Sequence, residues 1–448
     1  MRIKSSIKRA HAFGFFYAIT ASVMFFAMAV LFLVGGYLID KNKLSFEDIL
    51  IILDYNKAIG IRSPNILFFD EVTSTLDNKS ESKISKVLED VGMNRTSSII
   101  AHRLSTIQNS DKIIVIDKEW TITGNMSIKR GSHTASTLAN GSVLVAGGYT
   151  GGISFNIAEL YNPSTGIWIT TGNMSVKRAY HTASTLANGS ILAAGGYSGV
   201  SYLNSSELYN PSTGIWITTG NLNAAREYHT ASTLANGSIL VAGGYSSNGS
   251  INSTELYNPS IGTWTMTGNL NVARAYHTAS TLADGSVLVT GGQSTAGYIN
   301  SAELYDPSTG IWTTTANMGI TRAYHTASTL ANGFVLVTGG KSTAGYINSA
   351  ELYNPSTGTW TLTGNMSIAR YYHTASIIAN GSVLVTGGYN GVCLNSGELY
   401  NPSTGTWTTT ANMTIGRYLH IASILANGKV LVTGGYSSGG YVTSTELY

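Results

Sequence analysis

A short apolar run that ends in Gly-Gly recurs seven times along the second part of the chain, from Gly147-Gly148 to Gly434-Gly435. Tryptophans keep the same spacing of 48 residues from Trp120 to Trp360, and Trp407 comes one residue early. A fixed period of this size is typical of propeller blades and solenoid repeats. The pattern therefore predicts one supersecondary unit, repeated around a propeller or along a solenoid.

The second unit illustrates the elements that each repeat predicts. Residues 178–185 are typical of a strand, and Asn188-Gly189 favours a two-residue hairpin turn because both residues tolerate positive φ. Residues 190–196 form the expected return strand, residues 206–209 a third, and a fourth begins at Trp216 after a turn rich in Pro and Gly. Four short antiparallel strands make one blade, so the fold class is all-β, a seven-bladed propeller.

The ends of the repeat region indicate how the ring closes. The last unit stops at residues 446–448 without a fourth strand, whereas Trp120 has no strands of its own before it. We expect a strand at Trp120 to complete the last blade, because closure pairs edges that would otherwise promote aggregation. The alternative is that Trp120 belongs to a blade lost from a longer chain.

Gly195, Gly196, Tyr209 and Trp216 stand in an order that resembles the kelch repeat, and the resemblance extends over residues 118–448. The two glycines allow close backbone contact, and the aromatic rings fill the wedge between blades. The resemblance implies that this region is a scaffold that binds a macromolecule and is not an enzyme.

Each unit also carries an arginine, a histidine and a glutamate at fixed places, represented by Arg178, His181 and Glu207. We expect the arginines and glutamates to form ion pairs that tie the blades together, since buried charges are tolerated when paired. No unit differs from the others, so a catalytic role is not expected. The seven symmetric histidines favour structural hydrogen bonds over a metal site.

Some propellers resemble galactose oxidase, a copper enzyme with a Cys–Tyr crosslink. Cys393 is the single cysteine of the chain and lies in a loop after Gly387-Gly388. No distinctive histidine lies near it in the sequence, so we interpret it as a partly buried thiol. No metal is expected.

The segment between Gly-Gly and the glutamate varies from unit to unit, while the turns hardly change. Loops on a rigid scaffold often carry recognition residues, and tyrosine suits such surfaces. We expect one variable face that binds a protein or a carbohydrate, although neutral drift would also produce variable loops. The predicted face consists of Phe155, Tyr202, Asn248, Tyr298, Tyr346, Cys393 and Tyr441.

Charged residues make up only 11% of the chain, and the formal net charge is +3. The surface is therefore polar but mostly uncharged, and nucleic acid is not an expected partner.

Residues 13–39 contain no charged side chain and exceed the roughly 20 residues that cross a bilayer as a helix. A secretory signal is the alternative, but its apolar core is usually shorter. Residues 1–45 are thus predicted to be a transmembrane helix with a basic flank, and residues 46–64 a junction. The charge bias favours a single-pass protein with an extracellular or lumenal propeller.

Residues 1–118 resemble parts of an ABC transporter of the multidrug-resistance type. Residues 9–50 resemble a late transmembrane helix and the start of the next, and residues 65–117 resemble part of the nucleotide-binding domain. Asp70 and Glu71 follow an apolar stretch as in the Walker B motif, Asp77 matches the D-loop and His102 the H-loop. The resemblance implies that Asp70 and Asp77 contribute to cofactor binding, and that Asp70, Glu71 and His102 are catalytic remnants.

The chain lacks the Gly-x-x-x-x-Gly-Lys-Ser/Thr and Leu-Ser-Gly-Gly-Gln motifs. Positioning of the phosphates provides nearly all of the catalysis in phosphoryl transfer. We therefore predict that this chain neither hydrolyses ATP nor transports, and that it uses ATP and Mg²⁺ only if the fragment is functional. A join of two unrelated genes near Lys118 would also produce this sequence.

Overall fold

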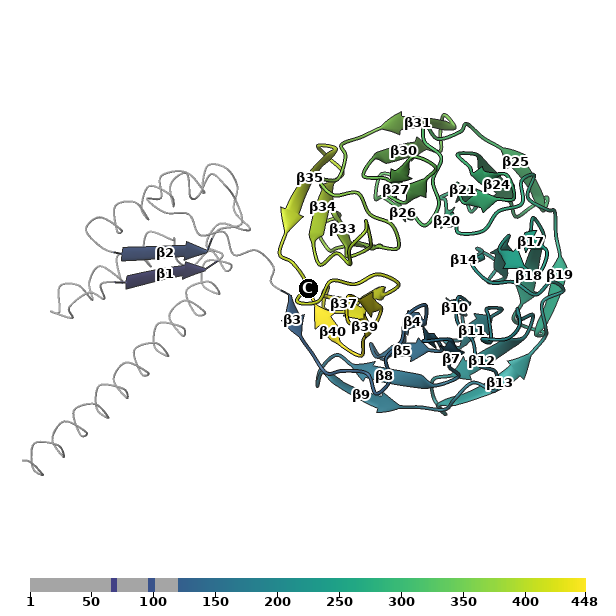
Figure 1. Cartoon of the computed structure of the whole chain (residues 1–448), viewed down its shortest axis with the longest axis horizontal. Coiled ribbons are helices and arrows are strands. Elements are labelled where there is room, and N and C mark those ends of the chain that lie inside the picture. Colours follow the sequence, from purple (N-terminus) through teal and green to yellow (C-terminus); the bar gives the residue numbers. More distant parts are fainter. Residues whose placement is uncertain (1–65, 71–95, 101–119) are drawn as a thin grey trace, which may run out of the picture. The chain divides into compact units, whose positions relative to one another are not determined.

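The computed structural model describes residues 66–70, 96–100 and 120–448 (Figure 1). The chain divides into two compact units, Met1–Val115 and Ile116–Tyr448. In the first unit, β1 (Ile66–Asp70) and β2 (Thr96–Ile100) pair in parallel. Parallel pairing is typical of α/β sheets, in which a crossover connects such strands.

Several predictions for the first unit lie outside the described residues: the helix at residues 13–39, and Glu71, Asp77 and His102. Asp70 is described only as the last residue of β1. Across the three described ranges, no helix has the length and apolarity to cross a bilayer. The transmembrane helix and the nucleotide-binding fragment therefore stay predictions.

The second unit is a ring of seven four-stranded antiparallel sheets, which we number as blades 1 to 7 (Figure 1). In each blade the first strand is innermost and the fourth lies at the outer rim. Blade 1 comprises β4 (Thr134–Thr137), β5 (Val143–Ala146), β8 (Ala158–Asn162) and β9 (Ile167–Thr170); blade 2, β10 (Thr182–Thr185), β11 (Ile191–Ala194), β12 (Ser206–Asn210) and β13 (Ile215–Thr219); blade 3, β14 (Thr230–Thr233), β15 (Ile239–Ala242), β18 (Thr254–Asn258) and β19 (Thr263–Met266); blade 4, β20 (Thr278–Thr281), β21 (Val287–Thr290), β24 (Ala302–Asp306) and β25 (Ile311–Thr314).

The remaining strands complete the ring and form short hairpins in its loops. Blade 5 comprises β26 (Thr326–Thr329), β27 (Val335–Thr338), β30 (Ala350–Asn354) and β31 (Thr359–Leu362); blade 6, β32 (Thr374–Ile377), β33 (Val383–Thr386), β34 (Gly397–Asn401) and β35 (Thr406–Thr410); blade 7, β36 (Ile421–Ile424), β37 (Val430–Thr433), β40 (Thr445–Leu447) and β3 (Thr121–Ile122). Five blades carry a short hairpin between the second and third strands: β6 (Tyr149–Thr150) with β7 (Ile153–Ser154), β16 (Tyr245–Ser246) with β17 (Gly249–Ser250), β22 (Gln293–Ser294) with β23 (Gly297–Tyr298), β28 (Lys341–Ser342) with β29 (Gly345–Tyr346), and β38 (Tyr436–Ser437) with β39 (Gly440–Tyr441).

The ring closes as the sequence predicts. Strand β3 pairs antiparallel with β40, so that Thr121 lies opposite Leu447 and Ile122 opposite Glu446. Blade 7 is therefore built from both ends of the repeat region, and its sheet has the order β3-β40-β37-β36. The seven-bladed all-β propeller is confirmed.

The first strand of each blade is shorter than predicted. In blade 2 the prediction began at Arg178, but β10 begins at Thr182. The cause is Tyr180, whose φ of 55° lies in the left-handed region and interrupts the extended backbone. The short hairpins of the variable loops were not predicted.

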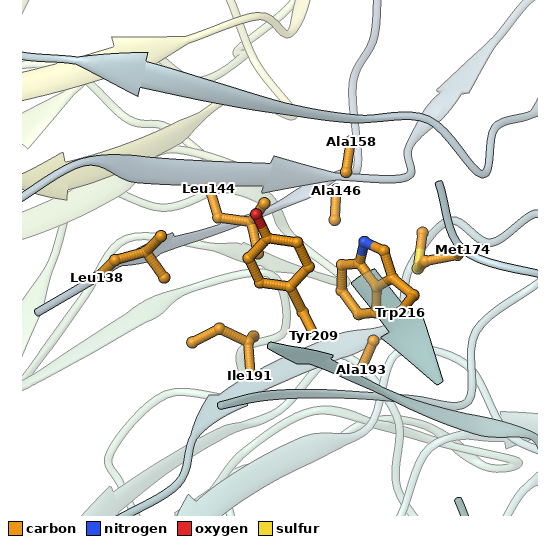
Figure 2. Close-up of a cluster of buried hydrophobic side chains, with 9 residues drawn as sticks. All are labelled: Leu138, Leu144, Ala146, Ala158, Met174, Ile191, Ala193, Tyr209 and Trp216. Carbon is orange, nitrogen blue, oxygen red and sulfur yellow. The ribbon is translucent and has the colours of Figure 1, made fainter. Parts of the chain in front are cut away.

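The core lies between the blades, in seven clusters of buried side chains, one at each interface of the ring. Tyr209 is fully buried, and its ring centroid lies 5.1 Å from that of Trp216. Aromatic rings bury more apolar area than other side chains, so these pairs dominate the packing between blades. Figure 2 shows the interface of blades 1 and 2, formed by Leu138, Leu144, Ala146, Ala158, Met174, Ile191, Ala193, Tyr209 and Trp216.

The Gly-Gly pair is required by close packing between blades. Gly195 and Gly196 have φ of 63° and 101°. A Cβ atom on Gly195 would lie 2.7 Å from the carbonyl oxygen of Arg226, and one on Gly196 would lie 2.6 Å from that of Ala179. Only glycine fits both the backbone conformation and the space.

Candidate binding face

A buried ion pair anchors the segment that leads into each blade. In blade 2, Nη2 of Arg178 lies 2.7 Å from Oε1 of Glu207, and Nη1 donates to the carbonyl oxygens of Gly195 and Ser205. Burial alone would raise the pKa of Glu207, but hydrogen bonds from Ser175 and Arg178 lower it. The pairs are Arg130–Glu159, Arg178–Glu207, Arg226–Glu255, Arg274–Glu303, Arg322–Glu351, Arg370–Glu398 and Arg417–Glu446, at 2.5 to 2.8 Å.

The backbone of the same arginine connects neighbouring blades. The amide of Arg178 donates to Phe155 of blade 1, and its carbonyl oxygen accepts from the amide of Gly148. Its side chain bonds to blade 2. Each ion pair thus lies within one repeat. The prediction that the ion pairs themselves tie two blades together is therefore wrong, because the backbone of the arginine makes that connection.

The histidines form side-chain links between neighbouring blades near the central axis. Nε2 of His181 lies 3.0 Å from Oγ1 of Thr134, which begins the first strand of blade 1. Blade 7 has Ile421 at that place, and His133 bonds to Thr433 instead. Burial is the main cause that lowers the pKa of all seven histidines, to about 3 for His277 and His420. They stay neutral at physiological pH.

The residue before each histidine lies next to the central axis in a left-handed conformation. Five of these residues are tyrosines, which we call the axial tyrosines: Tyr180, Tyr228, Tyr276, Tyr324 and Tyr372. Ser132 and Leu419 take the place in blades 1 and 7, with φ of 54° and 56°. Amide-to-carbonyl hydrogen bonds of 3.0 to 3.2 Å run from one of these residues to the one before it, six in all, from Ser132–Leu419 to Tyr372–Tyr324.

The axial tyrosines pack side by side, with 4.2 to 4.6 Å between successive ring centroids. They line an open cavity of about 240 Å³ together with four of the histidines. Burial is the main cause that raises the pKa of these phenols, to about 12 for Tyr324. The mouth of the ring is therefore an aromatic surface with neutral hydroxyl groups.

Other tyrosines complete the circle where blades 1 and 7 lack an axial one. Ring contacts continue from Tyr372 to Tyr418, Tyr436, Tyr441 and Tyr149, and Tyr149 contacts Tyr180. Their centroid distances are 4.9 to 6.3 Å. We call this circle, together with the loop tyrosines Tyr197, Tyr202, Tyr245, Tyr298, Tyr346, Tyr371 and Tyr389, the tyrosine face.

Backbone bridges place the variable loops on this same face. The residue before each axial position pairs with the residue after Gly-Gly, as Glu227 does with Tyr245. The loop that enters a blade and the loop between its second and third strands therefore lie together. The Asn-Gly turns lie at the opposite ends of the strands.

Five predicted face residues occupy equivalent places, each paired with the residue that follows Gly-Gly: Tyr202, Tyr298, Tyr346, Cys393 and Tyr441. Tyr346 stacks on Tyr371, with centroids 5.4 Å apart and an interplanar angle of 6°. Nζ of Lys341 lies 5.9 Å from the ring centroid of Tyr346 and 5.7 Å from that of Tyr371. This part of the face therefore holds an ammonium group close to both rings of a stacked tyrosine pair.

The other two predicted residues, Phe155 and Asn248, lie elsewhere in their loops. The amide of Phe155 donates to Gly148 as that of Leu203 does to Gly196, so Phe155 corresponds to an apolar loop position and is half-buried. Asn248 is exposed at the tip of its hairpin. Cys393 is half-buried, forms a bridge with Tyr389, and burial raises the pKa of its thiol.

The described residues do not gather metal ligands. No group of three His, Cys, Asp or Glu side chains comes together within residues 66–70, 96–100 and 120–448. The histidines point one by one to threonines of the preceding blades.

Sequence reasoning missed the axial tyrosines and Glu227. A signal was present, because tyrosine precedes the histidine in five of the seven units. Treating that stretch as a strand concealed its place beside the axis. Glu227 is the single charged residue among the seven that precede the axial positions.

Comparisons with known families agree with this architecture. Residues 216–364 and 263–435 match the KLHDC2/KLHL20/DRC7 Kelch-repeats domain, and residues 130–175 and 178–223 match the Kelch motif. Residues 2–59 match the ABC transporter transmembrane region.

Curated relatives are similar over a short stretch. The ABC-type transporter fsqE of Aspergillus fumigatus is 45% identical over 82 residues, 18% of this chain and 6% of that protein. ABC transporter B family member 15 of Arabidopsis thaliana is 41% identical over 104 residues, 23% of this chain and 7% of that protein. An ATP-dependent lipid A-core flippase of Acinetobacter baylyi is 43% identical over 82 residues, 18% of this chain and 13% of the flippase. The chain thus spans a small fraction of these relatives.

Among solved structures, a fungal alcohol oxidase of the AA5 family in complex with copper superposes with a TM-score of 0.62. The match covers 74% of this chain and 76% of the oxidase, at 20% sequence identity. At this identity the likeness concerns the fold.

Proposed function

Because the chain carries kelch repeats that form a seven-bladed propeller, after a segment related to ABC transporters, we propose that the propeller is a scaffold that binds a protein on its tyrosine face. The observation that carries this proposal is the closed circle of tyrosine ring contacts around the axis. Tyrosine is enriched at protein interfaces because it combines a large apolar ring with a polar tip.

The rigidity of the face supports the proposal. The axial tyrosines are joined through their own backbone, and the arginine pairs fix the segments that carry them. Binding to a preorganised surface loses less conformational entropy than binding to flexible loops. The opposite turns, with sequences such as Asn188-Gly189, present no such cluster of rings.

The repeat glutamates do not contribute negative charge to the tyrosine face. All seven repeat glutamates are used internally by the repeat arginines. The tyrosine face therefore exposes rings and hydroxyl groups, with Lys129, Lys177 and Lys341 as its cations.

Replacement of axial tyrosines tests the proposal. Tyr228, Tyr276 and Tyr324 are changed together to serine, which Ser132 shows to be compatible with the same backbone conformation. Proteins captured by the full-length chain are compared for this variant, the wild type and Asp284→Asn, a change on the opposite turns that restores the asparagine of the other units. Loss of a captured protein in the triple variant alone supports the proposal; equal capture by all three overturns it. Capture that a glycosidase abolishes would assign a carbohydrate instead.

For the first unit, we propose a single membrane anchor at residues 13–39 that places the propeller outside the cytoplasm. The match of residues 2–59 to a transporter transmembrane region supports this assignment. Resistance of the chain to alkaline extraction, lost on deletion of residues 13–39, is the expected result. Protease added outside sealed membranes should then reach the propeller.

We propose further that the chain needs no cofactor, and that the fragment at residues 65–117 does not hydrolyse ATP. The absent phosphate-binding motifs support this proposal, since the remaining aspartates cannot replace a backbone cradle and its lysine.

A further inference from the structure

Glu227 is the one charged residue at a place where the other blades have small or aromatic side chains. The equivalents are Gly131, Ala179, Ala275, Ala323, Tyr371 and Tyr418. Its backbone does what theirs does: the amide of Glu227 donates to Tyr245, and its carbonyl oxygen accepts from the amide of Tyr245. The fold therefore does not require a carboxylate here.

The Glu227 side chain is buried without a counter-charge. Glu227 is only 8% exposed, yet within residues 120–448 its carboxylate takes part in no ion pair and accepts no side-chain or backbone hydrogen bond. Burial raises its pKa to about 7. An unpaired buried carboxylate is unfavourable, and a cation that reached it would relieve that cost.

Tyrosines of the blade 2 loop and of the axial circle lie close enough to this carboxylate to be affected by its charge. Tyr202 of the blade 2 loop lies with its ring centroid 6.2 Å from that of Tyr245 and 5.5 Å from that of Tyr197. Burial, and then the charge of Glu227, raise the pKa of Tyr202. On the axial side, the charge of Glu227 also acts on Tyr276.

The chemistry of this group of residues selects a cation. Tyrosine ring faces attract ammonium groups through their quadrupole, and a carboxylate adds a direct ionic contact. The same face shows the first part of this recognition, because Nζ of Lys341 already lies 5.9 Å from the ring centroid of Tyr346 and 5.7 Å from that of Tyr371. A metal ion would need further ligands, and the described residues provide no cluster of three.

We propose that Glu227, with Tyr202 and Tyr245, binds the ammonium group of a lysine side chain on the protein partner. This inference rests on the proposed function, and it names the chemistry of the partner at one point of the tyrosine face.

Small molecules test the inference independently of any protein partner. The full-length chain is titrated calorimetrically with Nα-acetyl-lysine methylamide, and with Nα-acetyl-norleucine methylamide as the uncharged counterpart. We expect saturable binding of the lysine derivative at pH 8, at least tenfold weaker binding by Glu227→Gln, and at least tenfold weaker binding of norleucine. Glu227→Ala, which introduces the residue of blades 2, 4 and 5, separates loss of the charge from loss of folding.

Asp284→Asn is the matched control, because it removes an exposed carboxylate from the opposite turns. It should bind the lysine derivative as the wild type does. Equal affinity of wild type and Glu227→Gln, or equal affinity for lysine and norleucine, would overturn the inference. If the amine fails to bind while the triple tyrosine variant still loses its protein, only this inference is wrong. If the amine binds but no captured protein depends on the axial tyrosines, the proposed function is wrong instead.

Discussion

Nε2 of His181 lies 3.0 Å from Oγ1 of Thr134, and this contact joins the residue that precedes the first strand of blade 2 to the first strand of blade 1. The same link is made between five further successive blade pairs, with distances of 2.9 to 3.1 Å. At the seventh interface His133 reaches Thr433 at 2.9 Å. The inner wall of the ring is thus held by neutral imidazoles.

These histidines predict loss of stability in mild acid. Their folded-state pKa values are lowered from about 6.5, to about 3 for His277, so the unfolded chain binds more protons between these values. Stability is complete above about pH 6.5 and falls as the pH decreases towards 3, by up to about 1.4 kcal/mol per pH unit for each histidine. Urea unfolding at pH 4.5, 6 and 7.5 measures the slope. His181→Gln should reduce the slope of stability against pH by an amount equivalent to at most one bound proton. An unchanged slope would count against this account.

The buried ion pairs predict a large asymmetry between single and double changes. Glu207→Gln leaves the Arg178 guanidinium, which is fully buried, without its counter-charge and should cost about 3 to 5 kcal/mol. The double variant Arg178→Met/Glu207→Leu should lose less than the sum of its single changes. Denaturant unfolding checks both, with Asp284→Asn as a control expected within about 0.5 kcal/mol of wild type. A loss below 1 kcal/mol for Glu207→Gln would contradict the role of the pair.

Two substitutions of Tyr209, in the wedge between blades, should reduce stability by different amounts. Tyr209→Phe removes the 2.8 Å hydrogen bond between the phenol and Oγ1 of Thr171 and should cost about 1 kcal/mol. Tyr209→Ala also removes the ring beside Trp216 and should cost about 3 to 5 kcal/mol. Thermal unfolding of the two variants should therefore rank them clearly. Equal losses would mean that the ring contributes little to packing.

Glu227 should affect stability with a pH dependence opposite to that of the histidines. The folded-state pKa of Glu227, about 7, lies above the usual value of 4.5. The protonated side chain therefore contributes fully to folding stability below pH 4.5, and this contribution is lost as the pH rises through 7. Glu227→Gln should therefore stabilise the protein at pH 8.5 by roughly 2 kcal/mol and change little at pH 5. Unfolding curves at the two pH values provide the comparison. A destabilised variant at pH 8.5 would show that the carboxylate has a partner.

For the transporter-related unit, we expect no nucleotide response. A ligand that binds only the folded state must raise its apparent stability, so the unfolding temperature of the full-length chain is followed with ATP and Mg²⁺ up to millimolar concentration. We expect no shift in the wild type or in Asp70→Asn. A saturable shift that Asp70→Asn abolishes would make this a nucleotide-responsive protein.

Much of the propeller could be predicted because its repeat is carried by residues with few alternatives. Gly195 and Gly196 meet neighbouring backbone that no side chain could approach, and Trp216 marks the outer strand of its blade. Such local requirements recur at every interface and so appear as a period in the sequence. Blade count, closure and strand order follow from them.

The binding face was harder to predict because it depends on contacts between blades. Tyr180 is in a left-handed conformation that tyrosine rarely adopts alone, and a backbone hydrogen bond to Ser132 of the preceding unit helps to hold it. The surroundings of Glu227 likewise include an adjacent blade, because its charge acts on Tyr202 of the blade 2 loop. In the blade 1 loop, alignment by sequence placed Phe155 beside Tyr202, whereas the hydrogen bonds align it with Leu203.

The closing strand β3 pairs with its neighbour through two residues, whereas the outer strands of the other blades pair through four or five. Tension applied along the chain from before Trp120 would act first on this short ladder. The ring would then open at blade 7 while the other six blades kept their pairing. A pull on residues that precede the propeller would therefore release the strand β3 from blade 7, at a load set by the contacts of Trp120, Thr121 and Ile122.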